Sequence, residues 1–356
     1  MSNKIKILFV IDSLKAGGAQ RVMSFIASNL DSEKFKTTLA VTGYEKDYAL
    51  DEENTEVIYM NKEKNRNAAW PLFKKILNNK YHIVFSTLSH INSIMAISAV
   101  FLRSPFFIGR ETFVLGSRQD NRRNSIAGIV LAYLQRTQLD MMICQSMDMY
   151  KDLYTNFGFK REKLVIINNP ISEKFLLKKS NLKKTIPTFI TVGRLSKEKG
   201  HERILRCLAK LRINFEYLII GSGKEKARID TLIKQLNLTQ KVKYIPFTKE
   251  ISKYLSASDL YLQGSYVEGF PNALLESCAV GTPAIVFNAP GGINEIILHD
   301  VNGFIAESET EFVDFLNIGL EKEWKAEDVR NSVLSRYSSE KIIKDYQVLF
   351  HKILKN

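Results

Sequence analysis

The sequence predicts an α/β protein built from two Rossmann-like, doubly wound domains that face each other across a cleft. Its 356 residues are enough for two domains of roughly 150 residues each. Short apolar runs alternate with helical segments along the chain, which is typical of parallel sheets joined by crossover helices. The alternation stops once and then restarts. Each half is therefore expected to form its own sheet, with ligands bound where the carboxyl ends of the strands meet.

The first domain is expected to span residues 1–170. It contains a helix at residues 20–30 and buried strands at residues 4–11, 37–42, 55–60, 82–87, 105–109, 141–144 and 164–167. Residues 171–187 are rich in Lys, Ser and Asn and end at Pro187, so they are interpreted as an interdomain linker.

The second domain is expected to span residues 188–338. Its strands are expected at residues 188–192, 215–220, 242–245, 260–263 and 284–287, and its helices at residues 201–211, 224–236, 251–257 and 271–280. Residues 339–356 form a last helix with apolar residues at helical spacing. We expect this helix to pack back on the first domain.

The composition is that of an ordinary globular protein, with 45% hydrophobic and 25% charged residues. The longest apolar run, residues 91–102, is too short to span a bilayer and is interpreted as a buried helix. The N-terminus lacks the pattern of a signal peptide, and the three cysteines are too widely spaced to suggest a disulfide framework. We therefore expect a cytoplasmic protein, and no structural metal site is expected either.

The net charge of +13 is shared by both halves of the chain. Such an excess fits an anionic partner, which could be a nucleic acid, an acidic membrane surface or a phosphorylated substrate. A lysine-rich, solvated surface without a partner explains the charge equally well.

Residues 268–276 hold the strongest functional signal. Glu268 stands at the end of the loop that follows the strand at residues 260–263, and Pro271 suits the first position of the next helix. The backbone N–H groups that then point out of the helix start form an anion site suited to a diphosphate, and they belong to Asn272, Ala273 and Leu274. Glu268 would face a sugar, and Glu276, about one turn inside the helix, a ribose. Either glutamate alone is more simply explained as a solvated residue.

Two loops after strands add candidate phosphate contacts. Arg194 and Lys199 lie five residues apart on a loop that enters a helix, where two cations could offset the charge of a diphosphate leaving group. Gly17 and Gly18 follow the first strand and let backbone N–H groups approach an anion closely. A capped helix start and a plain turn are the structural alternatives for these two loops.

The segment from Glu268 to Glu276 resembles the motif of two glutamates, separated by seven residues, of family 4 of the retaining glycosyltransferases, the glycosyl transferases group 1. Its interior, including Gly269, Phe270 and Pro271, resembles the usual filling of that motif. The loop at residues 193–200 and the glycines at residues 290–303 match in the expected order.

The resemblance also implies roles outside the motif. Gly221 and Gly223 follow one strand and Phe247 follows another, at positions that cradle the nucleobase in the family. The loop with Gly17 and Gly18 is similar to the one that approaches the donor phosphates and the acceptor.

The first domain resembles the family less closely. His90 is similar to the residue that the family places near the donor sugar, although a histidine at a helix start has a structural explanation too. Arg110 and Glu111 resemble a Ser-Glu-Arg-Asn element that would contact the acceptor, but Gly109 and Thr112 depart from it.

The family implies a GT-B fold, with the donor in the second domain, the acceptor in the first, and transfer with retention at the anomeric carbon. It implies neither a metal nor a cofactor. The expected co-substrate is a nucleotide-diphosphate sugar, with UDP favoured, and the expected acceptor is a lipid-linked oligosaccharide for O-antigen, capsule or a related polysaccharide. Glu268, Arg194, Lys199 and His90 are the expected catalytic residues.

Two other functions fit parts of the pattern. A nucleic-acid-binding protein is suggested by charge alone, but no recognisable binding module is present. A GT-B epimerase that cleaves a nucleotide sugar would need the same grip on the diphosphate.

Two segments could lie on an anionic membrane surface on the inner face of the cell membrane. Residues 70–77 interleave apolar and basic side chains, and Arg118, Arg122 and Arg123 precede the apolar residues 126–134. Ordinary amphipathic helices packed on the first sheet would give the same pattern.

Overall fold

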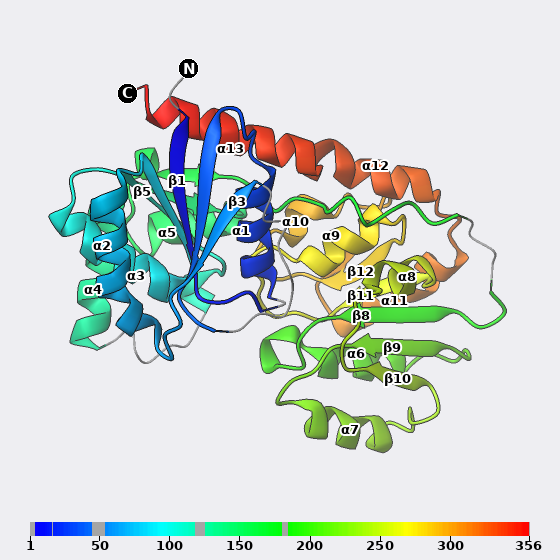
Figure 1. The fold of residues 1–356 in the computed structure, drawn as a ribbon. Coiled ribbons are helices and arrows are strands. Elements are labelled where there is room, and N and C mark those ends of the chain that lie inside the picture. The colour runs from blue at the N-terminus through cyan, green and yellow to red at the C-terminus, as the bar shows by residue number, and fades with distance from the viewer. Residues whose placement is uncertain (1–3, 16, 45–53, 118–124, 180–183, 356) are drawn as a thin grey trace. The chain divides into compact units, whose positions relative to one another are not determined.

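The computed structural model describes residues 4–15, 17–44, 54–117, 125–179 and 184–355. The chain divides into two compact units. The first comprises residues 1–170 together with 340–356, and the second comprises residues 171–339. Each unit is a parallel sheet with helices packed against it, as the sequence predicts (Figure 1).

Within the described residues of the first unit, seven strands form one parallel sheet in the order β3-β2-β1-β4-β5-β6-β7. The strands are β1 (Ile5–Ile11), β2 (Phe35–Val41), β3 (Thr55–Tyr59), β4 (Ile83–Thr87), β5 (Phe106–Arg110), β6 (Met141–Cys144) and β7 (Leu164–Ile166). The helices are α1 (Gly18–Asn29), α2 (Ala69–Asn79), α3 (Ser89–Phe101), α4 (Ile126–Gln138), α5 (Met147–Thr155) and α13 (Ser339–Ile353).

The last helix, α13, belongs to the core of the first unit. Its apolar side chains, among them Tyr346 and Phe350, are buried with those of α1 and with one face of the sheet. The ring of Phe350 meets that of Phe35 in β2 edge-on, with centroids 6.2 Å apart. The chain thus returns to its first unit after completing the second.

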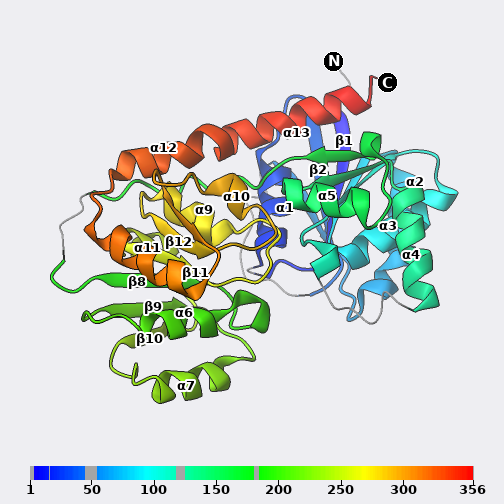
Figure 2. The same ribbon diagram turned by 180° about the vertical axis from the view of Figure 1, so that it is seen from behind.

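In the described part of the second unit, six strands form a parallel sheet in the order β10-β9-β8-β11-β12-β13. They are β8 (Thr188–Val192), β9 (Glu216–Ile220), β10 (Val242–Ile245), β11 (Leu260–Gln263), β12 (Ala284–Phe287) and β13 (Gly303–Ala306). The helices are α6 (His201–Leu208), α7 (Lys226–Gln235), α8 (Ile251–Ser256), α9 (Asn272–Ala279), α10 (Ile293–Ile296), α11 (Glu309–Glu321) and α12 (Ala326–Tyr337). Figure 2 shows this unit from behind.

The segment interpreted as a linker is structured where it begins. Ile171 pairs with Ser338 in a β-bridge, and Phe175 is fully buried in the core of the second unit. The backbone N–H of Lys178 donates to the carbonyl of Val280 at 3.0 Å. Residues 171–179 therefore belong to the second unit, because two apolar side chains among the lysines are buried there.

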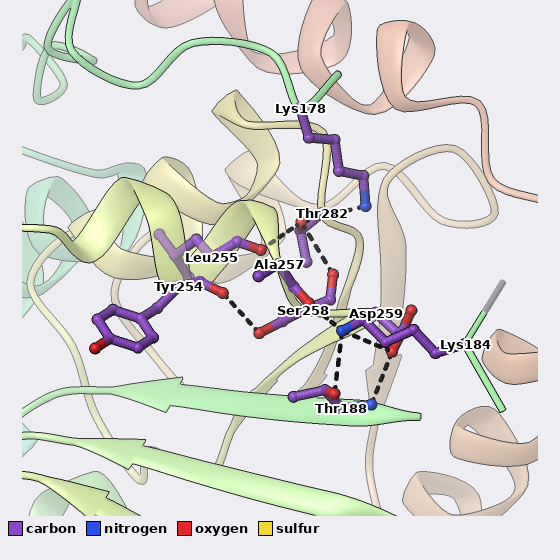
Figure 3. A network of polar contacts seen from close by, with 9 residues as sticks. All are labelled: Lys178, Lys184, Thr188, Tyr254, Leu255, Ala257, Ser258, Asp259 and Thr282. Carbon is purple, nitrogen blue, oxygen red and sulfur yellow. Dashed lines mark hydrogen bonds and ion pairs between the residues drawn. The ribbon is translucent and has the colours of Figure 1, made fainter. Parts of the chain in front are cut away.

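A polar network joins the amino-terminal ends of β8 and β11 in the second unit (Figure 3). Asp259 accepts the backbone N–H of Thr188 at 2.7 Å, and Lys184 lies 3.7 Å from the same carboxylate. The ammonium of Lys178 points at Thr282, whose hydroxyl lies 3.4 Å away (Figure 3). Burial lowers the pKa of Lys178 to about 8.

The run at residues 91–102 was expected to form a buried helix, but only one part of it is buried. It forms most of α3, and Ile91, Ile94 and Met95 are buried as predicted. Phe101, however, is 71% exposed at the end of the same helix. The run is apolar because two faces of the helix carry apolar side chains. One of these faces does not pack on the sheet.

Candidate active site

The second unit holds a pocket at the carboxyl ends of β8 and β11. It encloses about 310 Å³ of empty space, part of it open to solvent. Its lining comes from the ends of the two strands, from the loops that follow them and from the first residues of α6 and α9. This is the edge where open α/β sheets bind ligands.

Lys199 and Glu268 meet in this pocket. The ammonium of Lys199 donates to both carboxylate oxygens of Glu268, at 2.6 and 2.8 Å. The hydroxyl of Ser265 donates to one of the same oxygens at 2.5 Å. The side chain of Glu268 is 9% exposed and that of Lys199 25%. A buried carboxylate is therefore compensated by a cation and a hydroxyl, and the cation remains accessible from the pocket.

The loops that carry this pair are fixed by close backbone approach. Gly200 has φ +58°, and a Cβ at this position would stand 1.8 Å from the carbonyl oxygen of Gly264. A Cβ on Gly264 would in turn stand 2.3 Å from the carbonyl oxygen of Gly200. Only glycine at both positions lets the two loops touch, and this contact sets the distance between Lys199 and Glu268.

Arg203, in the first turn of α6, holds the second loop in place. Its guanidinium donates to the carbonyl of Gly264 at 2.6 Å and also to the carbonyl of Ser265. It lies 4.2 Å from the ring centroid of Tyr266 and 4.0 Å from that of Phe287. Two directed hydrogen bonds and two ring contacts therefore fix the segment that leads to Glu268.

Helix α9 starts at the wall of the pocket. Pro271 has ψ 88° and stands just before the helix, which begins at Asn272 and so one residue later than the sequence suggests. The first helical hydrogen bond runs from Leu275 N–H to the carbonyl of Pro271, at 3.1 Å. The N–H groups before Leu275 point out of the helix start, where the helix dipole favours an anion.

Two further polar side chains line the pocket. Gln263 is 4% exposed, and its amide nitrogen has no hydrogen-bond partner among the described residues. The Nε2–H of His201 donates a hydrogen bond to the carbonyl of Arg194 at 3.1 Å, and burial lowers the pKa of its imidazole, which favours the neutral ring. Both residues add polar groups that a ligand could contact.

The structure brings together five of the residues that the sequence assigns to the site. Lining the pocket are Lys199, Glu268, Pro271, Asn272 and Ala273. Arg194 stands apart, because its side chain is 76% exposed and lies 3.6 Å from Glu198.

Four other residues that the sequence assigns to the donor site are near the pocket but do not line it. Glu276 and Leu274 are buried in α9, and Gly269 and Phe270 in the loop before it. The ring of Phe270 packs edge-on against Tyr337 in the core, at 5.4 Å between centroids.

The expected nucleobase residues lie beyond neighbouring strands. Gly221 and Gly223 follow β9 and touch the backbone of residues 193–195, so they support the loop of Lys199. Phe247 follows β10 and is 64% exposed. Most of this residue is therefore accessible to solvent.

The candidates from the first unit occupy the ends of β1, β4 and β5. Gly17 is the N-cap of α1, and Gly18 is its first residue. His90 is in the first turn of α3, where desolvation lowers the pKa of its ring and Asp12 opposes that effect. Leu88, just before α3, has φ +74°, a strained conformation for a branched side chain.

Arg110 and Glu111 lie inside the first unit. Arg110 is fully buried, and its guanidinium donates to the amide oxygen of Asn169. Glu111 is 2% exposed, and one of its carboxylate oxygens accepts the backbone N–H of Thr112 at 2.9 Å. The acceptor role of this pair stays a prediction from the sequence.

Ser265, Gln263, His201 and Arg203 were not assigned to the site from the sequence. Ser265 and Gln263 could have been suspected, since they border the strand that precedes Glu268. Nothing in the sequence singles out Arg203, because its partners are backbone carbonyls some 60 residues away.

No group of metal-ligating side chains occurs among the described residues. None of the described helices is long and apolar enough to cross a membrane.

The fold and the pocket define a class of protein: two Rossmann-like units of the GT-B type, with a cation and a helix start at the ligand edge of the second unit. The family model described as "Glycosyl transferases group 1" matches residues 172–333, and that described as "Glycosyltransferase Family 4" matches residues 16–175. The chain belongs to this family of glycosyltransferases.

Relatives match most of the chain. An uncharacterized glycosyltransferase of Haemophilus influenzae is 26% identical, over 95% of this chain and 98% of its own. N-acetylgalactosamine-N,N'-diacetylbacillosaminyl-diphospho-undecaprenol 4-alpha-N-acetylgalactosaminyltransferase of Campylobacter jejuni is also 26% identical, over 86% and 87% of the two chains. Among solved structures, Anabaena HepE in complex with UDP and glucose shares the fold, with a TM-score of 0.81 and 20% identity over 98% of this chain and 100% of that one.

Proposed function

We propose that this glycosyltransferase moves a hexose from a UDP-sugar to a lipid-linked glycan acceptor, with retention at the anomeric carbon and without a metal ion. The observation that carries the proposal is the pairing of Lys199 with Glu268 beside the start of α9. A cation and a helix N-terminus at one pocket edge can share a diphosphate.

The donor diphosphate would lie between Lys199 and the first turn of α9. Lys199 lines the pocket, so its ammonium could bind a diphosphate on one side while it stays paired with Glu268 on the other. Arg194 could swing in, because its exposed side chain makes, among the residues that the structure describes, only a long contact with Glu198. These cations would offset the charge that develops on the leaving group, the part that a metal ion plays in other transferases.

The remaining parts of the donor would extend from that point. Glu268 would hold hydroxyls of the donor sugar, and Glu276 would contact the ribose. The exposed ring of Phe247, with Gly221 and Gly223, would border the nucleobase. UDP is the favoured nucleotide because HepE, which shares the fold, binds UDP and UDP-glucose.

The acceptor would be bound by the first unit. Gly17 and Gly18 stand at the carboxyl end of the central strand β1, where a parallel sheet binds ligands, and His90 at the start of α3 would lie near the donor sugar. A lipid-linked acceptor is supported by the Campylobacter relative, whose name specifies a diphospho-undecaprenol substrate, and by an O-antigen biosynthesis glycosyltransferase of Escherichia coli, 34% identical over 27% of this chain. Such an acceptor would bring the enzyme to the membrane surface as a peripheral protein.

Thermal unfolding in a panel of nucleotides tests the donor. A ligand at 100 times its dissociation constant adds about 2.7 kcal/mol to stability, so the true nucleotide should raise the melting temperature while the others should not. We expect UDP and one UDP-sugar to stabilise the protein more than GDP, ADP and their sugars, with and without EDTA. Equal shifts with all three nucleotides would contradict the proposed donor.

NMR of the product formed from the identified donor tests the stereochemistry, since retention requires the anomeric configuration of donor and product to be the same. Incubation with the donor alone tests the epimerase reaction: a sugar epimerised without any acceptor would overturn the proposed transfer.

A further inference from the structure

Three helices of the first unit carry an unusual share of exposed apolar side chains. Of the 22 large hydrophobic residues that are exposed in the described part of the chain, nine lie on α2, α3 and α4, which together contain only 37 residues. They are Trp70, Leu77, Ile97, Val100, Phe101, Ile126, Ile129, Val130 and Tyr133. We call these nine residues the apolar face.

The three helices that carry the apolar face are adjacent. The ring of Trp70 stacks on Phe73 with 5.7 Å between centroids, and Phe73 meets Phe101 edge-on at 6.3 Å, so α2 and α3 are joined. Helix α3 is joined to α4 by Gln135, whose amide donates to the hydroxyl of Ser93 at 2.7 Å. The three helices lie side by side in both views of the fold (Figures 1 and 2).

The charges on these helices are of one sign. None of the residues of α2, α3 and α4 is an Asp or a Glu. Basic side chains border the apolar face instead, among them Lys74, whose ammonium lies 5.2 Å from the ring centroid of Trp70. Lys75 is on the same helix, Lys80 directly follows it, and Arg103 lies two residues beyond α3.

The exposure decides between the two explanations for residues 70–77 and 126–134, whereas Arg118, Arg122 and Arg123 lie outside the described residues. Amphipathic helices packed on a sheet bury their apolar stripe, and α2 does so with Leu72 and Ile76. The side chains of the apolar face are a second set that remains in water. Ile126 is 83% exposed and Trp70 63%. Packing within the first unit therefore does not account for them, and contiguous exposed apolar residues mark interaction sites.

We infer that the apolar face binds the surface of a bilayer containing anionic lipids. Apolar side chains enter the boundary between headgroups and acyl chains while the surrounding lysines and arginines contact anionic headgroups. A second copy of the chain is a poorer occupant, because two faces of the same positive sign repel each other. The inference deepens the proposed function and rests on it, since a lipid-linked acceptor is presented at such a surface.

Vesicle sedimentation tests this inference with the full chain and without donor or acceptor. We expect binding to vesicles of phosphatidylcholine and phosphatidylglycerol at low salt, and weaker binding to phosphatidylcholine alone. The double variant Phe101→Ser/Ile126→Ser should lose roughly tenfold or more in affinity. Lys74→Glu should lose roughly 30-fold, because it changes the charge by two units and each charge near an anionic surface contributes about 1 kcal/mol.

Two variants on α13 of the same unit are matched controls. Val348→Ser removes another exposed apolar side chain, and Lys344→Glu makes the same charge change as Lys74→Glu. Both should bind vesicles as the wild type does. Thermal unfolding of every variant shows whether the fold is kept, and release of UDP from the donor shows whether the catalytic site is kept.

The outcomes separate the two proposals. Wild-type protein that ignores anionic vesicles at low salt, or face variants that bind like the α13 controls, would overturn the inference. The inference would also be overturned if the wild type self-associated, the face variants were monomeric and neither bound vesicles. In that case the apolar face would be the contact with a second copy of the chain. If the protein bound vesicles but transferred no sugar, the membrane-binding surface would be supported and the proposed function would be rejected.

Discussion

The ammonium of Lys199 lies 2.6 and 2.8 Å from the two carboxylate oxygens of Glu268. The two residues come from different loops, 69 positions apart, and meet at the carboxyl ends of adjacent parallel strands, β8 and β11. The pair keeps Lys199 extended into the pocket before any ligand arrives. It also compensates the buried carboxylate, so each residue needs the other.

Replacing Lys199 by Met should remove most of the turnover while keeping the length of the side chain. We expect a loss of about 100-fold or more, the usual cost of removing one group that stabilises charge in the transition state. Stability should fall by about 1–2 kcal/mol, because Glu268 loses its cation but keeps the hydroxyl of Ser265. Steady-state kinetics and thermal unfolding measure the two effects.

The neighbouring Lys197, exposed on the same loop, is the matched control. Lys197→Met should leave both turnover and stability near the wild type. If Lys199→Met retained wild-type turnover, Lys199 would not be the group that offsets the diphosphate charge.

Replacing Arg203 by Lys should lower kcat without weakening the binding of UDP. The guanidinium holds the carbonyls of Gly264 and Ser265, and an ammonium cannot make both directed bonds in the same geometry. Glu268 would then be displaced from the donor sugar, and a displacement of about 1 Å costs roughly 100-fold in rate.

The two readouts for Arg203→Lys are kcat and the dissociation constant of UDP from titration calorimetry. Arg206→Lys, on the exposed side of the same helix, should change neither value. A parallel loss of UDP affinity in Arg203→Lys would mean that the whole pocket has collapsed, which contradicts a role limited to positioning.

Gly200→Ala should destabilise the second unit by about 2 kcal/mol or more. The new Cβ would stand 1.8 Å from the carbonyl oxygen of Gly264, and φ +58° is unfavourable for alanine. Gly193→Ala, in the same loop, is the control. Its Cβ would meet only side-chain carbons of Lys199, at 3.9 Å. Chemical unfolding should therefore separate the two variants. Equal stabilities would show that the contact between the loops is not rigid.

The sheets could be predicted closely because buried parallel strands are short apolar runs with clear ends. The strands at residues 141–144, 188–192, 242–245, 260–263 and 284–287 have the predicted bounds. The predicted start of α9 was wrong by one residue, since the ψ of Pro271, 88°, lies outside the helical range. That angle depends on the loop before it, which local sequence does not specify.

The site was predictable where a motif names residues, and less so where the fold brings backbone together. Lys199 and Glu268 were both assigned from loops after strands, but their direct pairing depends on contact between Gly200 and Gly264. Arg203 acts on carbonyl groups, which carry no sequence signature. The exposure of Phe101 was missed because an apolar run looks the same whether or not a protein surface covers it.

The partly buried ammonium of Lys178 makes stability depend on pH. Burial lowers its pKa in the folded protein to about 8, with Lys184 acting in the same direction and Asp259 against it, while the ordinary value is 10.5. Below pH 8 the group is charged in both states, and the folded protein bears the full cost of the buried charge. Between pH 8 and 10.5 the folded state loses its proton first, so that cost disappears as the pH rises.

Replacing Lys178 by Met should therefore stabilise the protein by about 1–3 kcal/mol at pH 7. The lowered pKa corresponds to a cost of roughly 3 kcal/mol for the charged group in the folded state, and the lost contact with Thr282 reduces the gain. The advantage over the wild type should shrink as the pH rises from 8 towards 10.5. Chemical unfolding at several pH values measures it. Lys179→Met, at the exposed neighbouring position, should show no such trend. If the stability advantage of Lys178→Met did not change with pH, the advantage would come from packing rather than from charge.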